Sequence, residues 1–98
     1  MRYFIANIAW IPYEEGGRKK RPPKGTRYCP LISIYRNGNC EMWSIDFICP
    51  DFDETKTIEF NFLVNDAPSD LVRNNVFYDV FEGNRKVAKI FVLNNGLQ

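Results

Sequence analysis

Apolar and polar side chains alternate in several segments of this 98-residue chain, and a two-residue period is typical of β-strands that bury one face. The clearest run is Thr57–Val64, in which every even-numbered residue from Ile58 to Val64 is apolar. No segment longer than about ten residues repeats apolar residues at the spacing of an amphipathic helix. The pattern therefore predicts an all-β protein, and the 15% aromatic content also favours strands.

Six strand-like runs of residues are separated by turn residues, which indicates a small antiparallel fold. Asn37-Gly38 and Gly83-Asn84 are two-residue turns of the kind that join hairpin strands. A chain of this length forms one domain, residues 1–98, with one core. We expect a six-stranded antiparallel Greek-key barrel, with a small sandwich as the alternative, because closure hides sheet edges. The expected strands are Tyr3–Pro12, Leu31–Tyr35, Cys40–Cys49, Thr57–Val64, Val76–Glu82 and Arg85–Leu93.

Both faces of the first expected strand are apolar. One face joins the predicted core, and the other carries Ile5, Ala9 and Ile11. If this second face is exposed, it predicts a protein partner or a self-associated dimer. The aromatic residues assigned to the core are Trp10, Trp43, Phe60 and Phe62.

Membrane and secretory segments are absent from the sequence. No stretch approaches the roughly 20 apolar residues of a membrane helix. The apolar stretch Tyr3–Ile11 follows a single Arg2, and no small-residue cleavage site comes after it. We expect a cytoplasmic protein that does not contact membranes.

The sequence offers little to an enzyme or a metal. It holds three cysteines, Cys29, Cys40 and Cys49, at spacings unlike a metal site, and it has no histidine. We expect buried or half-buried free thiols, with one disulfide and one leftover thiol as the alternative. The commonest general base is thus missing, and no serine lies in a nucleophile motif. The expectation is no enzymatic activity, no cofactor and no metal.

Two sets of acidic residues are candidates for catalytic or metal-binding groups. Asp51, Asp53 and Glu54 form an acidic loop that lacks the central glycine of a calcium-binding loop. Its charge is opposite to that of a basic loop elsewhere in the chain, which leaves intermolecular pairing open. Asp46 and Glu59 are the candidates for a carboxylate pair, but alternation predicts that both face solvent.

Two glycine–arginine signatures and one shorter element carry a resemblance to a known family. The signatures are Glu14-Glu15-Gly16-Gly17-Arg18 and Glu82-Gly83-Asn84-Arg85, and the element between them is Gly25–Pro30. Their order and spacing resemble the C-terminal, third barrel of elongation factor Tu and related translational GTPases. The resemblance implies a six-stranded antiparallel barrel. The chain has no P-loop, so nucleotide binding is not expected.

The resemblance also implies partners. In that family the barrel contacts the T stem of aminoacyl-tRNA, the GTPase domain and an exchange factor. Glu82 and Gly83 match a pair of tRNA-contacting positions in the last hairpin. A family glutamine, however, is replaced here by Leu31, which cannot hydrogen-bond RNA. The tRNA role is therefore only half matched by the residues.

A basic loop is the strongest charge feature. Six cations within ten residues can neutralise phosphates, and Tyr13 and Tyr28 flank them for stacking. A solvated loop and a nuclear-import-like motif are the alternatives. The cations are Arg18, Lys19, Lys20, Arg21, Lys24 and Arg27.

The sequence thus predicts a non-enzymatic binding module. Its first expected partner is another protein, including a second copy, and structured RNA bound by residues 18–27 is the alternative; a small enzyme ranks last. The expected contact surfaces are the basic loop and the turn that contains Glu82, Gly83 and Arg85. Either Arg18 or Arg85 can instead brace its own loop, and Arg85 is preferred for that structural role.

Overall fold

The computed structural model describes residues 2–97, which form seven β-strands and two 3-10 helices of three residues each. No helix in this range is long and apolar enough to cross a membrane. The elements are β1 (Phe4–Trp10), η1 (Tyr13–Glu15), β2 (Arg27–Tyr28), β3 (Leu31–Arg36), β4 (Asn39–Ile48), β5 (Thr57–Phe62), η2 (Ser69–Leu71), β6 (Phe77–Glu82) and β7 (Arg85–Asn94).

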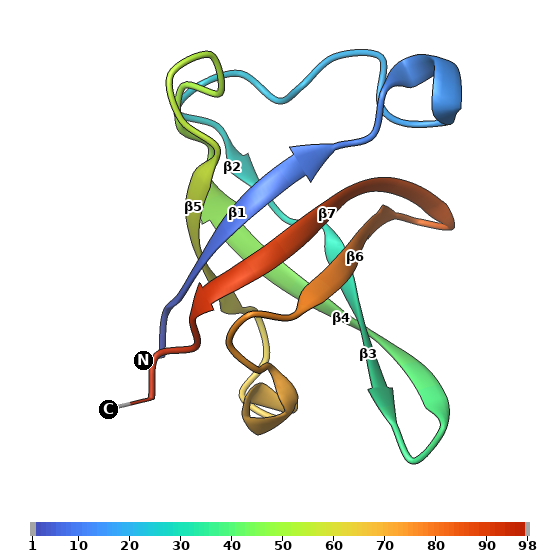
Figure 1. The fold of residues 1–98 in the computed structure, drawn as a ribbon, viewed down its shortest axis with the longest axis vertical. Helices are drawn as coiled ribbons and strands as arrows, with labels where there is room; N and C mark the ends of the chain where they lie inside the picture. Colours follow the sequence, from blue (N-terminus) through green and yellow to red (C-terminus); the bar gives the residue numbers. More distant parts are fainter. Residues whose placement is uncertain (1, 98) are drawn as a thin grey trace.

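Six of the strands close into an antiparallel barrel (Figure 1). Around the barrel the neighbours are β4, β3, β6, β7, β1 and β5, and β5 returns to β4 through the pair Ile45↔Phe62. The strands β3, β4 and β5 are consecutive neighbours, and β1 lies beside β5, which is the Greek-key arrangement. The predicted all-β, six-stranded barrel is confirmed.

The two-residue strand β2 was not predicted. It pairs with the end of β4, where Tyr28 lies opposite Phe47. Leu31 of β3 lies opposite Ser44, three residues further on along both strands. β2 therefore extends the pairing of β3 along the same edge of β4. Pro30 lies between β2 and β3 and separates them, because proline has no N–H for a ladder bond.

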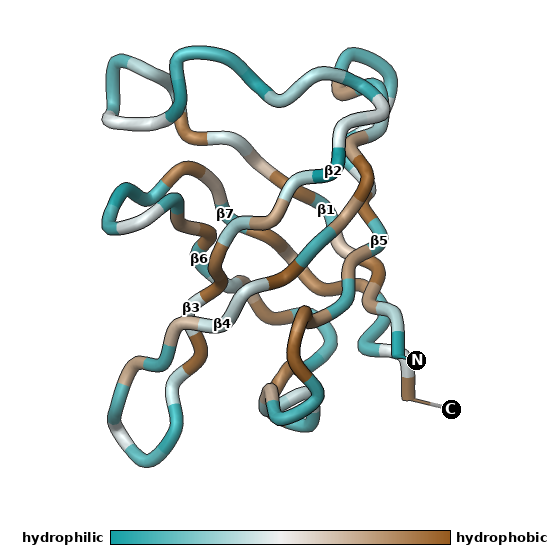
Figure 2. The backbone as a smooth tube through the Cα atoms, turned by 180° about the vertical axis from the view of Figure 1, so that it is seen from behind, coloured by the Kyte–Doolittle hydropathy of each residue, from teal (hydrophilic) through white to brown (hydrophobic). Residues whose placement is uncertain are grey.

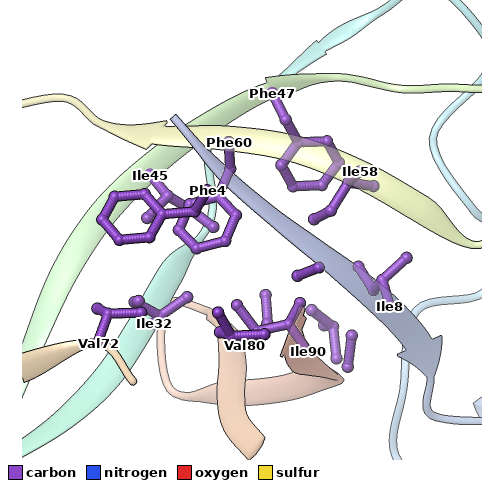
Figure 3. Packing of buried hydrophobic residues seen from close by; sticks show 14 of the residues in the cluster. Phe4, Ile8, Ile32, Ile45, Phe47, Ile58, Phe60, Val72, Val80 and Ile90 are labelled. Carbon is purple, nitrogen blue, oxygen red and sulfur yellow. The ribbon is translucent and has the colours of Figure 1, made fainter. Parts of the chain in front are cut away.

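The core forms where the inward faces of the six strands meet. Figure 3 shows side chains from opposite walls turned toward one another. Phe4 and Phe60, on the neighbouring strands β1 and β5, stack at a ring-centroid distance of 5.0 Å. In Figure 2 the apolar segments run along the strands, and the loops at the upper end are mostly hydrophilic. The fully buried large side chains include Phe4, Phe60, Ile32, Ile34, Ile45, Ile90, Val72, Val80, Val87 and Val92.

Alternation located the core well but misplaced its margins. Of the four predicted core aromatics only Phe60 is buried; Trp10, Trp43 and Phe62 are half-buried and pack against the core from its rim. Val64, placed on the inward face by its even number, is 49% exposed. The reason is that β5 ends at Phe62, so the two-residue period no longer applies two residues later.

Two further expectations are corrected by the fold. Cys49 is buried, but Cys29 and Cys40 are exposed, because one lies between two strands and the other just after a hairpin turn. All three are free thiols. On the outer face of β1 only Ala9 is exposed, while Ile5 and Ile11 are half-buried, so these three residues do not make a contiguous exposed patch.

Candidate functional site

The loops predicted to bind partners gather at one end of the barrel. The loop end consists of the basic loop (residues 18–27), the acidic loop (residues 50–56) and the β6–β7 turn. The basic and acidic loops pass close to each other at the top of Figure 1, and Arg21 Nη1 of the basic loop donates to Phe52 O of the acidic loop at 3.2 Å. These segments are far apart in sequence, so their meeting is a product of barrel closure.

The glycine pair of the first signature sets the path of the basic loop. Gly16 ends the 3-10 helix η1 with a φ of 99°, a left-handed conformation that glycine adopts without strain. Gly17 is buried, and its N–H donates to Pro12 O at 3.1 Å. A Cβ at Gly17 would lie 1.9 Å from Ile11 O, so no other residue fits there. The two glycines turn the chain so that Arg18 points back over the barrel.

Arg18 joins the two signatures. Its Nη1 donates to Glu82 Oε2, and Tyr28 OH donates to the same carboxylate oxygen. The Arg18 guanidinium also lies over the Tyr28 ring, 5.4 Å from its centroid, and Nε donates to Lys20 O at 2.8 Å. Burial, together with the hydrogen bond to Glu82, raises the pKa of Tyr28, so the phenol stays a donor.

This arrangement corrects the role preferred for Arg85. Arg18, and not Arg85, braces the loops by linking the first signature to the last hairpin. Arg85 is exposed, and among residues 2–97 its side chain has no hydrogen bond or ion pair. Glu82 is engaged by two donors, so it is less available for RNA than the family resemblance implies. Gly83 is exposed at the tip of the turn with a φ of 60°.

Two more arginines of the basic loop are also fastened to carboxylates. Arg21 Nη2 lies 2.6 Å from Asp53 Oδ1 and joins the basic loop to the acidic loop. Arg27 donates to Asp46 Oδ2 at 2.6 Å and 2.8 Å. Opposite charges of the two loops therefore pair within the molecule, at Arg21 and Asp53, whereas the sequence had left pairing between molecules open. Within the basic loop, the residues left exposed and without an ion pair among the described residues are Lys19, Lys20 and Lys24.

A hollow of about 630 Å³ lies between the basic and acidic loops. Trp10 and Phe52 line it and pack edge to face at a centroid distance of 5.3 Å. Lys19, Lys20 and Lys24 border the same hollow. An aromatic surface with a lysine border suits a ligand that combines flat or apolar groups with negative charge.

The candidate carboxylates Asp46 and Glu59 both border one hollow of about 610 Å³. Asp46, one half of the candidate pair, is held by Arg27, and Glu59 is exposed on β5. Within residues 2–97 no group of three metal-ligating side chains comes together.

A second candidate surface, missed from the sequence, lies on the outside of β6, β7 and β1. Phe77 of β6 packs against Phe91 of β7 at a centroid distance of 4.8 Å, and Lys89 Nζ lies 5.7 Å from the Phe77 ring centroid. Phe77 is 60% exposed and borders a hollow of about 230 Å³ that reaches Ala9. We call Ala9, Phe77, Lys89 and Phe91 the outer aromatic face.

Comparison with known proteins assigns no function: the chain matches no protein-family model and no curated protein.

Proposed function

We propose that this chain is a non-enzymatic binding module whose principal ligand is another protein. The observation that carries the proposal is the outer aromatic face, where the exposed Phe77 is held in place by Phe91 on a closed sheet. Rigid aromatic side chains at the centre of a surface patch are common anchors of protein interfaces. The exposed thiols of Cys29 and Cys40 suit the reducing cytoplasm, which we propose as its location.

Structured RNA is the second candidate ligand. The observation in its favour is the hollow lined by Trp10 and Phe52, with Lys19, Lys20 and Lys24 unpaired at its border. Against it, the arginines Arg18, Arg21 and Arg27 already bond to carboxylates of the same molecule. Half of the predicted cations are thus neutralised, and protein binding is preferred.

We also propose kinship with the C-terminal barrel of elongation factor Tu. The support is that Arg18 of the first signature bonds to Glu82 of the second, which gives a physical reason for the two to occur together. In this view the Arg18–Glu82 contact maintains the barrel, and the partner surface of this chain lies elsewhere on it.

An affinity pull-down from host lysate, with and without ribonuclease, tests the choice between protein and RNA. We expect a partner that ribonuclease does not release and that Phe77→Ser loses. Ile48→Ser is the matched control, because Ile48 is 61% exposed on β4, away from the outer aromatic face. Release by ribonuclease and by combined Lys19→Ala, Lys20→Ala and Lys24→Ala would instead support RNA. Retention by Phe77→Ser would contradict this face as the contact surface.

A further inference from the structure

The barrel is closed, but one of its seams is short. β3 and β6 pair at only two positions, the last of which is Ile32↔Val80. β3 continues for four residues to Arg36, and β6 begins three residues earlier, at Phe77. In Figure 1 the β3–β4 hairpin extends away from the barrel beyond this point. Each strand therefore has a stretch without a neighbour on the side of the seam.

The pairing of β3 with β4 fixes where the β3 backbone groups point. The two residues that flank the tight Asn37-Gly38 turn form a hydrogen-bonded pair, and such pairs recur at every second residue. Ser33 and Tyr35 fall between them, so their N–H and C=O groups point away from β4. Ser44 of β4 belongs to the same set, and it accepts from Leu63 N at 3.1 Å on its outer edge, as this alternation requires.

The same reasoning applies to β6. Val92 N of β7 donates to Val76 O at 3.1 Å, so the residues of β6 that bond to β7 are at even positions. Phe77 and Asp79 therefore direct their backbone groups away from β7, toward the seam. Ile32↔Val80 is then a non-hydrogen-bonded pair, and the rung beyond it joins Ser33 N–H to Asp79 O. Past that rung, the exposed residues Tyr35 of β3 and Phe77 of β6 have no ladder partner across the seam, and free strand edges of this kind can pair with an added strand.

A cleft of about 410 Å³ occupies the seam between the two unpaired stretches. Its lining includes Tyr35, which is 73% exposed, and Phe77 of the outer aromatic face. The charge of Asp79 is offset by Lys86, whose Nζ lies 2.9 Å from Asp79 Oδ1. Lys89 remains as the cation of the cleft without a carboxylate partner among residues 2–97.

We propose that this cleft receives an extended segment of the partner protein, which pairs with the free edge of β3 as an added strand. Bonds to the backbone N–H and C=O of Tyr35 supply the main-chain recognition, and alternate side chains of the segment meet Phe77. Lys89 favours a segment that carries an acidic residue at that point. The inference rests on the proposed protein-binding function and adds the mode of binding and the chemistry of the bound segment.

A second copy of the chain fits this site less well. Its own β3, Leu31–Arg36, contains no acidic residue, so it offers nothing to Lys89. The nearest carboxylate of the same hairpin, Glu41 of β4, is already paired with Arg36 at 3.1 Å. The observations therefore favour a different protein with an apolar and acidic segment.

The test uses the full chain and an array of blocked seven-residue peptides. The peptides alternate valine or phenylalanine with threonine and carry either glutamate or lysine at the centre. We expect binding of glutamate peptides in titration calorimetry, weakened about tenfold or more by Tyr35→Pro, which removes the edge N–H. Met42→Pro is the matched control, because Met42 lies on β4 of the same hairpin and its N–H points to the opposite edge.

Amide exchange of the wild-type protein provides a readout that does not depend on the folding of a variant. Bound peptide is expected to protect the amide of Tyr35 and to leave that of Met42 unchanged. The proposal is overturned if no peptide binds, if Tyr35→Pro and Met42→Pro bind equally, or if the β3 edge gains no protection. It is also overturned by a dimer that Tyr35→Pro dissociates, since a second copy would then occupy the edge.

The same variants separate this inference from the proposed function. If the ribonuclease-resistant partner is lost by Phe77→Ser but unaffected by Tyr35→Pro, the chain binds protein and strand addition is wrong. If neither substitution affects the partner, both the outer aromatic face and the added strand are wrong. Loss of the partner in both variants, but not in Met42→Pro, supports both.

Discussion

The two ends of this barrel are fastened in opposite ways. At the loop end, the basic loop has almost no regular structure, yet Arg18, Arg21 and Arg27 each bond to a carboxylate on a different segment. At the other end of Figure 1, the β3–β4 hairpin is regular strand, yet it pairs with β5 and β6 only near its base. Regular secondary structure and attachment to the rest of the molecule are thus separate properties.

This contrast separates groups that hold the fold from groups that remain available to other molecules. In the basic loop the arginines act within the molecule, and the lysines stay free for solvent or a ligand. In the hairpin β4 pairs with β3 along the full length of β3, and the outward backbone groups beyond its base have no ladder partner. Strands can therefore be the more available part of a β-barrel when their neighbours diverge.

The largest expected effect comes from Gly17→Ala. A Cβ would lie 1.9 Å from Ile11 O, so the backbone of residues 11–17 would have to move and the attachment of Arg18 would weaken. We expect the free energy of unfolding to fall by about 2–3 kcal/mol, as measured by urea denaturation. Gly16→Ala is the control, because a Cβ there meets nothing within 4 Å and only its positive φ is strained. That control is expected to cost about 1 kcal/mol.

If Gly17→Ala lowers the free energy of unfolding by no more than Gly16→Ala does, the proposed contrast between the two ends of the barrel is wrong. It would mean that the backbone of the loop end can move without disturbing the barrel. The arginine contacts would then be incidental surface pairs.

The second expected effect concerns the carboxylate shared by Arg18 and Tyr28. Glu82→Gln keeps the shape of the side chain but removes the charge that accepts from both donors. We expect a loss of about 1–2 kcal/mol in the free energy of unfolding, because hydrogen bonds to charged groups are the stronger ones. Glu59→Gln, exposed on β5, is the control and is expected to change stability by less than about 0.5 kcal/mol. If Glu82→Gln and Glu59→Gln change the free energy of unfolding equally, Glu82 does not help to hold the loops together.

The strands were predictable because their evidence is local. Alternation over five or more residues located six strands, and the two-residue turns located two hairpins. β2 escaped because two residues cannot show a period. A β-bulge escaped as well: the Gly83-Asn84 turn alone would place Phe77 opposite Ile90, but the register shift at Val80/Phe81 moves it opposite Phe91. The outer aromatic pair could not be seen without that bulge.

The roles of the site residues depended on contacts that the sequence does not encode locally. The basic loop was found from its charge, and the family resemblance identified both signatures. The bond between Arg18 and Glu82 joins residues 64 positions apart, so only the closed barrel shows which arginine is the brace. The open seam beside Tyr35 depends on the divergence of two strands, and no pattern within either strand records it.

The pH dependence of stability gives the third expected effect. Burial, and the bond to Glu82, raise the pKa of Tyr28 in the folded protein. The unfolded phenol ionises near pH 10, while the folded one keeps its proton to higher pH. The stabilisation is therefore complete below pH 10 and declines above it, by up to about 1.4 kcal/mol per pH unit. We expect urea denaturation between pH 9 and pH 11, wherever the fold persists, to show that the free energy of unfolding declines less steeply with pH in Tyr28→Phe than in the wild type. Equal slopes for the two proteins would mean that Tyr28 does not take part in the brace.

The smallest expected effect tests the contact between the two loops. Arg21 and Asp53 are both exposed, so solvent screens their ion pair even though the two atoms are 2.6 Å apart. We expect Arg21→Ala to lower the free energy of unfolding by about 0.2–1 kcal/mol, and most of that loss to disappear at about 1 M salt. Lys19→Ala removes a neighbouring cation that has no ion pair, and it is expected to change stability by less. A salt-independent loss above about 2 kcal/mol would show that the Arg21 bond to the backbone of Phe52, at 3.2 Å, holds the loop instead of the charge pair.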